Sequence, residues 1–369
     1  MNTTKDLKRP LEILQSSFFP NYLGVLYYFR SHRIGDTNFE SLLYHYKARN
    51  IGYNKDEMVD KFKGYYPISA IDYIVKTSID QEIFAINEHH LNHENRIFME
   101  LLLEKLYQNG FRNIFVEGIN ADLSNIHQVS SFIGYYTLNP SYAAFLRKAL
   151  ELGFIVNSYE SSEISSHPDK AHRQSFRDYI QAENIIDKIN SLPSTKSILY
   201  AGSSHIEKSS GNGWKKTVQY LSEILLDKKI YCADQSKMGN VDLGKSDYFN
   251  FVNDEYALSE PSVFLNDNGE VLMDHPQLYD LQIFFPRSKD WYSHHYLDIS
   301  ITLDTRFLGM HLLVYRKETV YYQSIPEQII EINSETISLS LREEYTYVYF
   351  IADHDGDVVF SDIIENNID

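Results

Sequence analysis

Short apolar runs alternate with stretches of helical periodicity across the middle of the chain. The clearest helical stretch covers residues 93–109, where Ile97, Leu101 and Leu106 recur at three-and-four spacing and Gly110 follows as a C-terminal cap. Strands are expected at residues 82–87, 113–116, 154–158, 197–201 and 229–233, and further helices at 142–152, 173–191 and 214–226. Strands that alternate with helices predict an α/β fold, with a mainly parallel sheet flanked by helices.

The hydrophobic pattern before and after this region of alternating strands and helices is different. Residues 1–65 read as a helical segment in which nothing looks catalytic. Alternating or aromatic-rich runs at 281–285, 297–303, 310–315, 320–324 and 345–351 are separated by turn residues, and Asp355-Gly356 is a tight-turn signal. We therefore expect an N-terminal helical segment (1–65), an α/β catalytic-type domain (66–294) and a small C-terminal β-sandwich-like domain (295–369).

Polar residues capable of chemistry follow each of the five expected strands directly. In chain order they are Glu88-His89-His90, Glu117, Glu160, Ser203-Ser204-His205 and Asp234-Gln235. The carboxyl ends of parallel strands lie along the same edge of a sheet. We therefore expect these residues to converge on one site.

The residue types at these strand ends are suited to acid/base chemistry. A carboxylate such as Glu88 beside an imidazole such as His90 can hold the tautomer of the ring and raise its pKa. Gly202 would let the chain leave its strand tightly before His205. A serine nucleophile is not favoured, because the G-x-S-x-G elbow is absent around Ser203.

Structural roles also account for some of these residues. Glu117 and Glu160 could cap helices or pair with Arg177, and Asp234 and Gln235 could orient a histidine, bind substrate or cap a helix. Both interpretations stay open from the residues alone.

Composition excludes several classes of function. The chain has 34 basic and 51 acidic side chains, and the formal net charge of -17 opposes binding to nucleic acid and to anionic lipid surfaces. No window approaches the roughly 18 apolar residues of a membrane span, and the first residues lack the pattern of a signal peptide. The single cysteine, Cys232, cannot form an internal disulfide. We expect a cytoplasmic protein without nucleic-acid or membrane partners.

The stretches at residues 86–119, 153–160, 173–185 and 196–207 resemble the erythromycin esterase, ChaN-like and Tiki/TraB superfamily. The resemblance covers roughly residues 68 to 235. The G-E-x-H element of the superfamily maps onto residues 87–90, its G-x-x-H element onto 202–205, and its helix arginine followed by an acid onto Arg177 and Asp178. Asn87 stands where glycine is usual, and Asp178 where glutamate is commoner.

The resemblance implies a hydrolase that acts on an ester, lactone or amide of a small molecule or peptide. We expect Glu88, His90, Glu117 and His205 to be catalytic: His90 would activate water and Glu88 would orient His90. His205 and Arg177 would stabilise an oxyanion or bind an acidic group of the substrate. The expected substrate-binding residues are Glu160, Arg177, Asp234 and Gln235.

Two alternatives remain beside this hypothesis. The first is a divalent-metal-dependent hydrolase or protease with His90, Glu117 and His205 as ligands. The second is a non-enzymatic binder of haem or another small molecule that uses the same histidines. The C-terminal region could form an oligomer in any of these cases.

Overall fold

The computed structural model describes residues 53–90, 92–130, 132–134, 136–160, 166–192, 196–210, 213–238, 246–288, 290–293, 295–320, 324–353 and 357–364. These residues form two compact units. The described residues before 125 and those from 148 to 291 form an α/β unit, and those from 125 to 147 and from 292 onward form a β-rich unit. Each unit is described separately.

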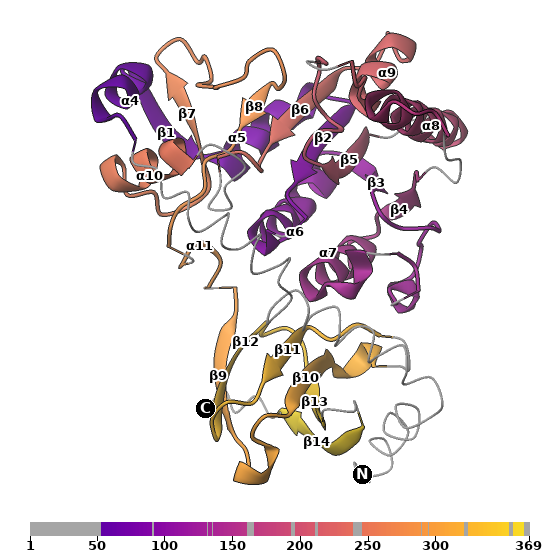
Figure 1. Ribbon diagram of the computed structural model, residues 1–369, viewed down its shortest axis with the longest axis vertical. Coiled ribbons are helices and arrows are strands. Elements are labelled where there is room, and N and C mark those ends of the chain that lie inside the picture. Colours follow the sequence, from indigo (N-terminus) through magenta and orange to yellow (C-terminus); the bar gives the residue numbers. More distant parts are fainter. Residues whose placement is uncertain are drawn as a thin grey trace. The chain divides into compact units, whose positions relative to one another are not determined.

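A six-stranded parallel sheet is the centre of the α/β unit (Figure 1). Its lateral order is β4 (Ile155–Ser158), β3 (Phe111–Val116), β5 (Lys196–Gly202), β2 (Ile83–Glu88), β6 (Ile230–Asp234) and β8 (Leu281–Gln282). Five of these strands match the expected apolar runs within two residues. Strands of a parallel sheet that is covered on both faces are buried along their whole length, as β2 is, and the predicted α/β class is therefore confirmed.

Strand β5 lies between β2 and β3, although β2 and β3 follow each other in the chain. The crossover from β2 to β3 therefore skips one position, which β5 fills later. After β5 the chain adds its next strand, β6, on the opposite side of β2, so the direction in which strands are added changes here. Such a switch point leaves a crevice at the carboxyl ends of the strands.

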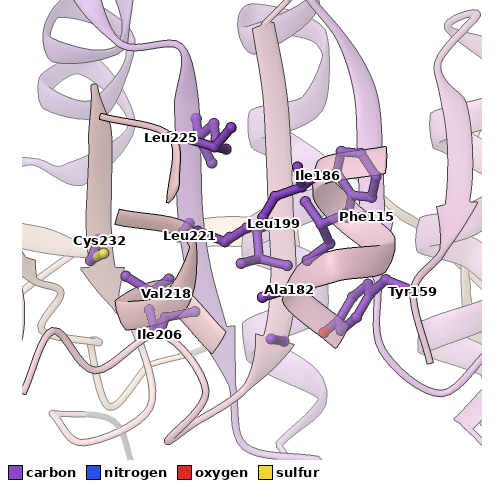
Figure 2. Packing of buried hydrophobic residues seen from close by; sticks show 14 of the residues in the cluster. Phe115, Tyr159, Ala182, Ile186, Leu199, Ile206, Val218, Leu221, Leu225 and Cys232 are labelled. Carbon is purple, nitrogen blue, oxygen red and sulfur yellow. The ribbon is translucent and has the colours of Figure 1, made fainter. Parts of the chain in front are cut away.

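Two helices, α8 (Lys170–Ser191) and α9 (Thr217–Ile224), pack against one face of this sheet. Leu199 of β5 lies close to Ile186 of α8 and Leu221 of α9 in this core (Figure 2). Helix α6 (His93–Gln108), which connects β2 to β3, lies on the other face (Figure 1). Gly110 ends α6 with a φ of +90°, as expected of a left-handed cap.

The other elements of this unit are α4 (Lys55–Phe62), β1 (Tyr65–Ser69), α5 (Ala70–Thr77), the 3₁₀ turn η1 (Ser78–Asp80), α10 (Ser246–Glu255) and β7 (Ser262–Asn266), which pairs antiparallel with β1. Pro67 lies within β1, and Ser69 caps α5. Most of the expected N-terminal helical segment lies outside the described residues.

The β-rich unit contains two antiparallel sheets that share an apolar core. One sheet has the order β11 (Gln328–Glu331), β10 (His311–Arg316), β13 (Tyr347–Ala352) and β14 (Val358–Ile364), and the other pairs β9 (Leu297–Thr302) with β12 (Thr336–Leu341). The 3₁₀ turns are η2 (Ile126–Gln128), η3 (Tyr136–Leu138), η4 (Thr305–Phe307) and η5 (Lys317–Thr319). Asp355-Gly356 lies outside the described residues, between β13 and β14.

Two helices fall at the sequence boundaries between the units: α7 (Pro140–Glu151) and α11 (Asp290–Ser293). The α/β unit ends close to the boundary expected at residue 294, but residues 125–147 group with the C-terminal sheets. The three-part division at residues 65 and 294 stays a prediction. No helix among the described residues combines the length and apolar character needed to cross a membrane.

Candidate functional site

His90 and Glu88 form a hydrogen-bonded pair at the carboxyl end of β2. Nδ1 of His90 lies 2.8 Å from Oε1 of Glu88. The Glu88 side chain is buried, whereas that of His90 is 34% exposed. The carboxylate therefore holds one ring nitrogen while part of the imidazole faces solvent.

Glu88 is itself held by a buried arginine and a tyrosine. Arg96, in the first turn of α6, donates from Nε and Nη2 to the two carboxylate oxygens at 2.7 and 2.8 Å, and the hydroxyl of Tyr200 donates to Oε2 at 2.8 Å. Burial alone would raise the pKa of Glu88, but the charges and hydrogen bonds of Arg96 and His90 outweigh it and hold that pKa far below its usual range. Glu88 is therefore ionised.

His205 and Asp178 form a second pair of the same kind. Nδ1 of His205 lies 2.7 Å from Oδ1 of Asp178, which is fully buried on α8. Burial alone would lower the pKa of His205, but the nearby carboxylates of Glu117 and Asp178 outweigh it, so the pKa is raised. His205 is therefore biased toward its protonated form.

Glu117, directly after β3, connects the two pairs. Its Oε2 accepts from the backbone N–H of Gly202 at 2.5 Å, and its Oε1 accepts from Nη2 of Arg177 at 2.9 Å and lies 3.6 Å from Nε2 of His205. Burial alone would raise the pKa of Glu117. The positive charges of His205, His90 and Arg177 and the Gly202 hydrogen bond outweigh it and lower that pKa to about 2.

Gly202, the last residue of β5, brings His90 and Glu117 together. A Cβ atom added at Gly202 would lie 2.8 Å from Nε2 of His90 and 3.0 Å from Oε2 of Glu117. Real Cβ atoms do not approach other atoms this closely, so the absence of a side chain here lets both groups reach the same point above β5. The expected convergence of the β2, β3 and β5 ends is therefore present in the structure.

Arg177 of α8 and Glu160 after β4 complete the arrangement. Nη2 of Arg177 donates to both oxygens of Glu160 at 3.0 Å, and Nη1 lies 3.3 Å from Nε2 of His205. Glu160 also accepts from the Gly118 backbone N–H and from the amide of Gln181. Arg177 therefore links His205, Glu117 and Glu160 into one network with part of its side chain exposed.

Asp234 and Gln235 are placed differently. Both are fully buried. Asp234 accepts from the amides of Asn87 and Gln282 and from Ser236, and the backbone of Gln235 bonds to Asn87 and Asn95. These contacts tie the end of β6 to its surroundings, and the substrate-binding role of the two residues stays a prediction.

The structure adds four residues to the site that the strand-end pattern missed: Arg96, Tyr200, Trp214 and Thr217. Of these, Arg96 had a readable signal. It shares a helical stripe with Met99 and Leu103, which are buried, and a charged residue on a buried stripe needs a partner. Trp214 and Thr217 lie near the start of α9 and had no comparable signal.

The metal alternative stays a prediction. Among the described side chains, no group of three or more His, Cys, Asp or Glu residues is arranged to hold a metal ion. The guanidinium of Arg177 lies among the proposed ligands, bonded to Glu117 and 3.3 Å from Nε2 of His205. A cation placed there would meet the positive charge of Arg177.

Comparison with known proteins gives only distant structural similarity. No family model matches the chain, and no curated protein matches its sequence. Similar solved structures include the type III effector HopBA1, with 13% identity over 50% of this chain and 87% of that one and a TM-score of 0.33. ChaN of Campylobacter jejuni, which binds haem cofacially, has 12% identity over 47% and 91% of the two chains and a TM-score of 0.34.

The C-terminal region of the Pasteurella multocida toxin, which has a thiol-protease-like catalytic triad, has 15% identity over 53% of this chain and a TM-score of 0.34. The alignment spans 30% of that chain. Similarity at this level carries no conclusion about activity or cofactor. A ChaN structure is thus among the distant neighbours of the fold, and any closer family assignment stays a prediction.

Proposed function

We propose that this protein is a hydrolase in which His90 activates water for attack on an ester, lactone or amide. The observation that carries this proposal is the Glu88–His90 pair, which is partly exposed and has Nε2 beside Gly202 and Glu117 at a topological switch point. Ionised Glu88 accepts a hydrogen bond from Nδ1–H of His90, and this tautomer leaves Nε2 as the ring nitrogen that can accept a proton. A general base needs this tautomer and access to water.

His205 and Arg177 supply positive charge next to this base. The raised pKa of His205 favours the imidazolium form, and Arg177 carries a permanent charge. When water attacks a carbonyl carbon, negative charge develops on the carbonyl oxygen, and nearby cations or N–H donors stabilise it. We assign this role to His205 and Arg177.

Glu117 and Glu160 would act on Arg177 rather than on the substrate. Together they accept three hydrogen bonds from its Nη2 atom, which fixes the guanidinium beside His205. A fixed donor stabilises a transition state better than a mobile one, because it needs no reorganisation during the reaction.

The test is hydrolysis of a panel of chromogenic esters, macrocyclic lactones and peptides by the wild type and two histidine variants. His90→Gln is expected to lower kcat/KM on any accepted substrate by about 10² to 10⁴, the usual contribution of a general base. The control His127→Gln changes an exposed histidine outside the site and should retain full activity.

Full activity of His90→Gln would remove His90 from the mechanism. Loss of activity with a chelator and recovery with a divalent ion would favour the metallohydrolase instead. A Soret band on haem titration that is lost in His90→Gln, without any hydrolysis, would favour the haem binder.

A further inference from the structure

The carboxylate of Asp178 depends on four hydrogen-bond donors from three residues. Oδ1 accepts from Nδ1 of His205 and from both the backbone N–H and the hydroxyl of Thr217, at 2.7, 2.8 and 2.6 Å. Oδ2 accepts from the indole Nε1 of Trp214 at 2.8 Å, the one donor that the described residues give this oxygen. Trp214 therefore holds the end of the carboxylate that His205 does not touch.

The indole ring of Trp214 is fixed from two sides. Nζ of Lys216 lies 3.2 Å from the ring centroid, and the ring of His205 meets it nearly edge-on at 5.6 Å between centroids. Lys216 is buried, and its ammonium pairs with Glu207, whose Oε2 lies 3.6 Å from Nζ. A buried ammonium is costly unless its charge is compensated, so the indole face adds to the pairing with Glu207, and the contact fixes the ring.

We propose that Trp214 is a positioning residue, which holds the Asp178 carboxylate in plane against His205, and that Lys216 fixes the indole for this purpose. An oxygen that loses its only donor in a buried site turns to recover one. In Asp178 such a turn would draw Oδ1 out of line with Nδ1 of His205. The catalytic meaning of this inference rests on the proposed function, but the geometry of the His205–Asp178 bond can be measured without it.

The main experiment is Trp214→Phe, which keeps an aromatic ring and removes the N–H donor. The readout is the Nδ1 proton of His205 in the NMR spectrum, assigned by its loss in His205→Gln. A proton held between imidazole and carboxylate resonates at low field and exchanges slowly with water. In Trp214→Phe this resonance is expected to move upfield and to exchange faster. On an accepted substrate, kcat should fall about tenfold or more while KM changes little, because only a transition-state interaction is weakened.

Two lysine variants separate this role from general effects of charge and folding. Lys216→Met should move the His205 resonance in the same direction by a smaller amount. The matched control is Lys215→Met, because Lys215 pairs with Glu223 and lies over the ring of Tyr220 instead. It should leave the resonance unchanged.

An unchanged His205 resonance in folded Trp214→Phe overturns the inference. If that variant does not fold, Lys216→Met decides, and a spectrum equal to that of Lys215→Met overturns it. If the resonance moves as expected but the wild type hydrolyses nothing in the panel, the proposed function fails and the positioning role stands.

Discussion

The two histidine–carboxylate pairs of the α/β unit have the same hydrogen bond but different surroundings. Glu88 is bound by the guanidinium of Arg96, whereas the donors to Asp178 other than His205 are the neutral groups of Trp214 and Thr217. His90 is partly exposed and His205 is buried. A cation beside a carboxylate offsets the charge that would otherwise stabilise an imidazolium.

Because of this difference, the two histidine–carboxylate pairs suit different tasks although they contain the same kinds of group. Arg96 neutralises Glu88, and Glu88 orients the ring of His90. The charges of Glu117 and Asp178 outweigh burial and raise the pKa of His205. The accessible imidazole thus suits a base and the buried one suits a cation.

The largest expected effect comes from removing Arg96, the cation that binds Glu88 of the Glu88–His90 pair. Arg96→Met leaves the Glu88 carboxylate buried without its main partner, and the free energy of unfolding should fall by about 3–5 kcal/mol. The comparison is Thr217→Val, which removes a neutral donor from Asp178 and should cost about 1–2 kcal/mol. Urea unfolding at pH 7 measures both. Equal costs would mean that the two carboxylates are held alike.

Glu117, which lies between the pairs, gives a pH-dependent prediction. Its pKa is about 2 in the folded protein against an ordinary value of 4.5. A lowered pKa adds stability that is fully present above pH 4.5 and is lost as the pH falls toward 2, about 3 kcal/mol in all. The stability gap between wild type and Glu117→Gln should therefore narrow from pH 6 to pH 3 in urea unfolding.

The exposed residue Glu104, on α6, provides the control for this experiment. Glu104→Gln should stay close to the wild type at both pH values. A gap for Glu117→Gln that is the same at pH 6 and pH 3 would show that its carboxylate does not titrate differently in the folded and unfolded protein.

Substitution of Gly202 tests whether the site needs the space above β5 that the missing Cβ atom leaves to His90 and Glu117. A methyl group there would meet Nε2 of His90 at 2.8 Å, and the partly exposed imidazole would have to move. Gly202→Ala should lower kcat on an accepted substrate by up to about 10², since small misplacements of reacting groups have effects of this size. The fold should persist. The neighbouring Ser203→Ala should keep its activity, and a matching loss there would reopen the question of a serine nucleophile.

Five of the six strands of the parallel sheet could be located from sequence, whereas β8 lies in the run 281–285 that was grouped with the C-terminal β runs. The lateral order of the strands could not be predicted. Each of these strands is a continuous apolar run that ends in a polar residue. Such a run can be recognised without knowing which strands lie beside it. Periodicity contains no information about which strands pair. The position of β5 between β2 and β3 therefore emerged only from the structure.

The candidate site shows the same distinction between residues that the local sequence indicates and residues that depend on the lateral order of the strands. Glu88, His90, Glu117 and His205 could be named because they lie at or shortly after the ends of predicted strands, and Asp178 through the family resemblance. Tyr200 could not be named, because it lies inside the apolar run of β5 and reaches Glu88 only when β5 is beside β2. In the β-rich unit, β12 was missed although Ile337, Leu339 and Leu341 alternate with polar residues.

Substitution of Tyr200 has the smallest predicted effect and gives the most sensitive test of how Glu88 and Asp178 differ. Tyr200→Phe removes one donor from Oε2 of Glu88, but Nε of Arg96 still donates to that oxygen at 2.7 Å. The expected cost is about 1 kcal/mol in the free energy of unfolding, the ordinary value for one hydrogen bond whose acceptor keeps another donor. Trp214→Phe should cost more, because Oδ2 of Asp178 then keeps no donor among the described residues. If Tyr200→Phe is instead the more damaging of the two in urea unfolding, the charged partner does not secure Glu88 better than the neutral donors secure Asp178, and the division of tasks between His90 and His205 loses its physical basis.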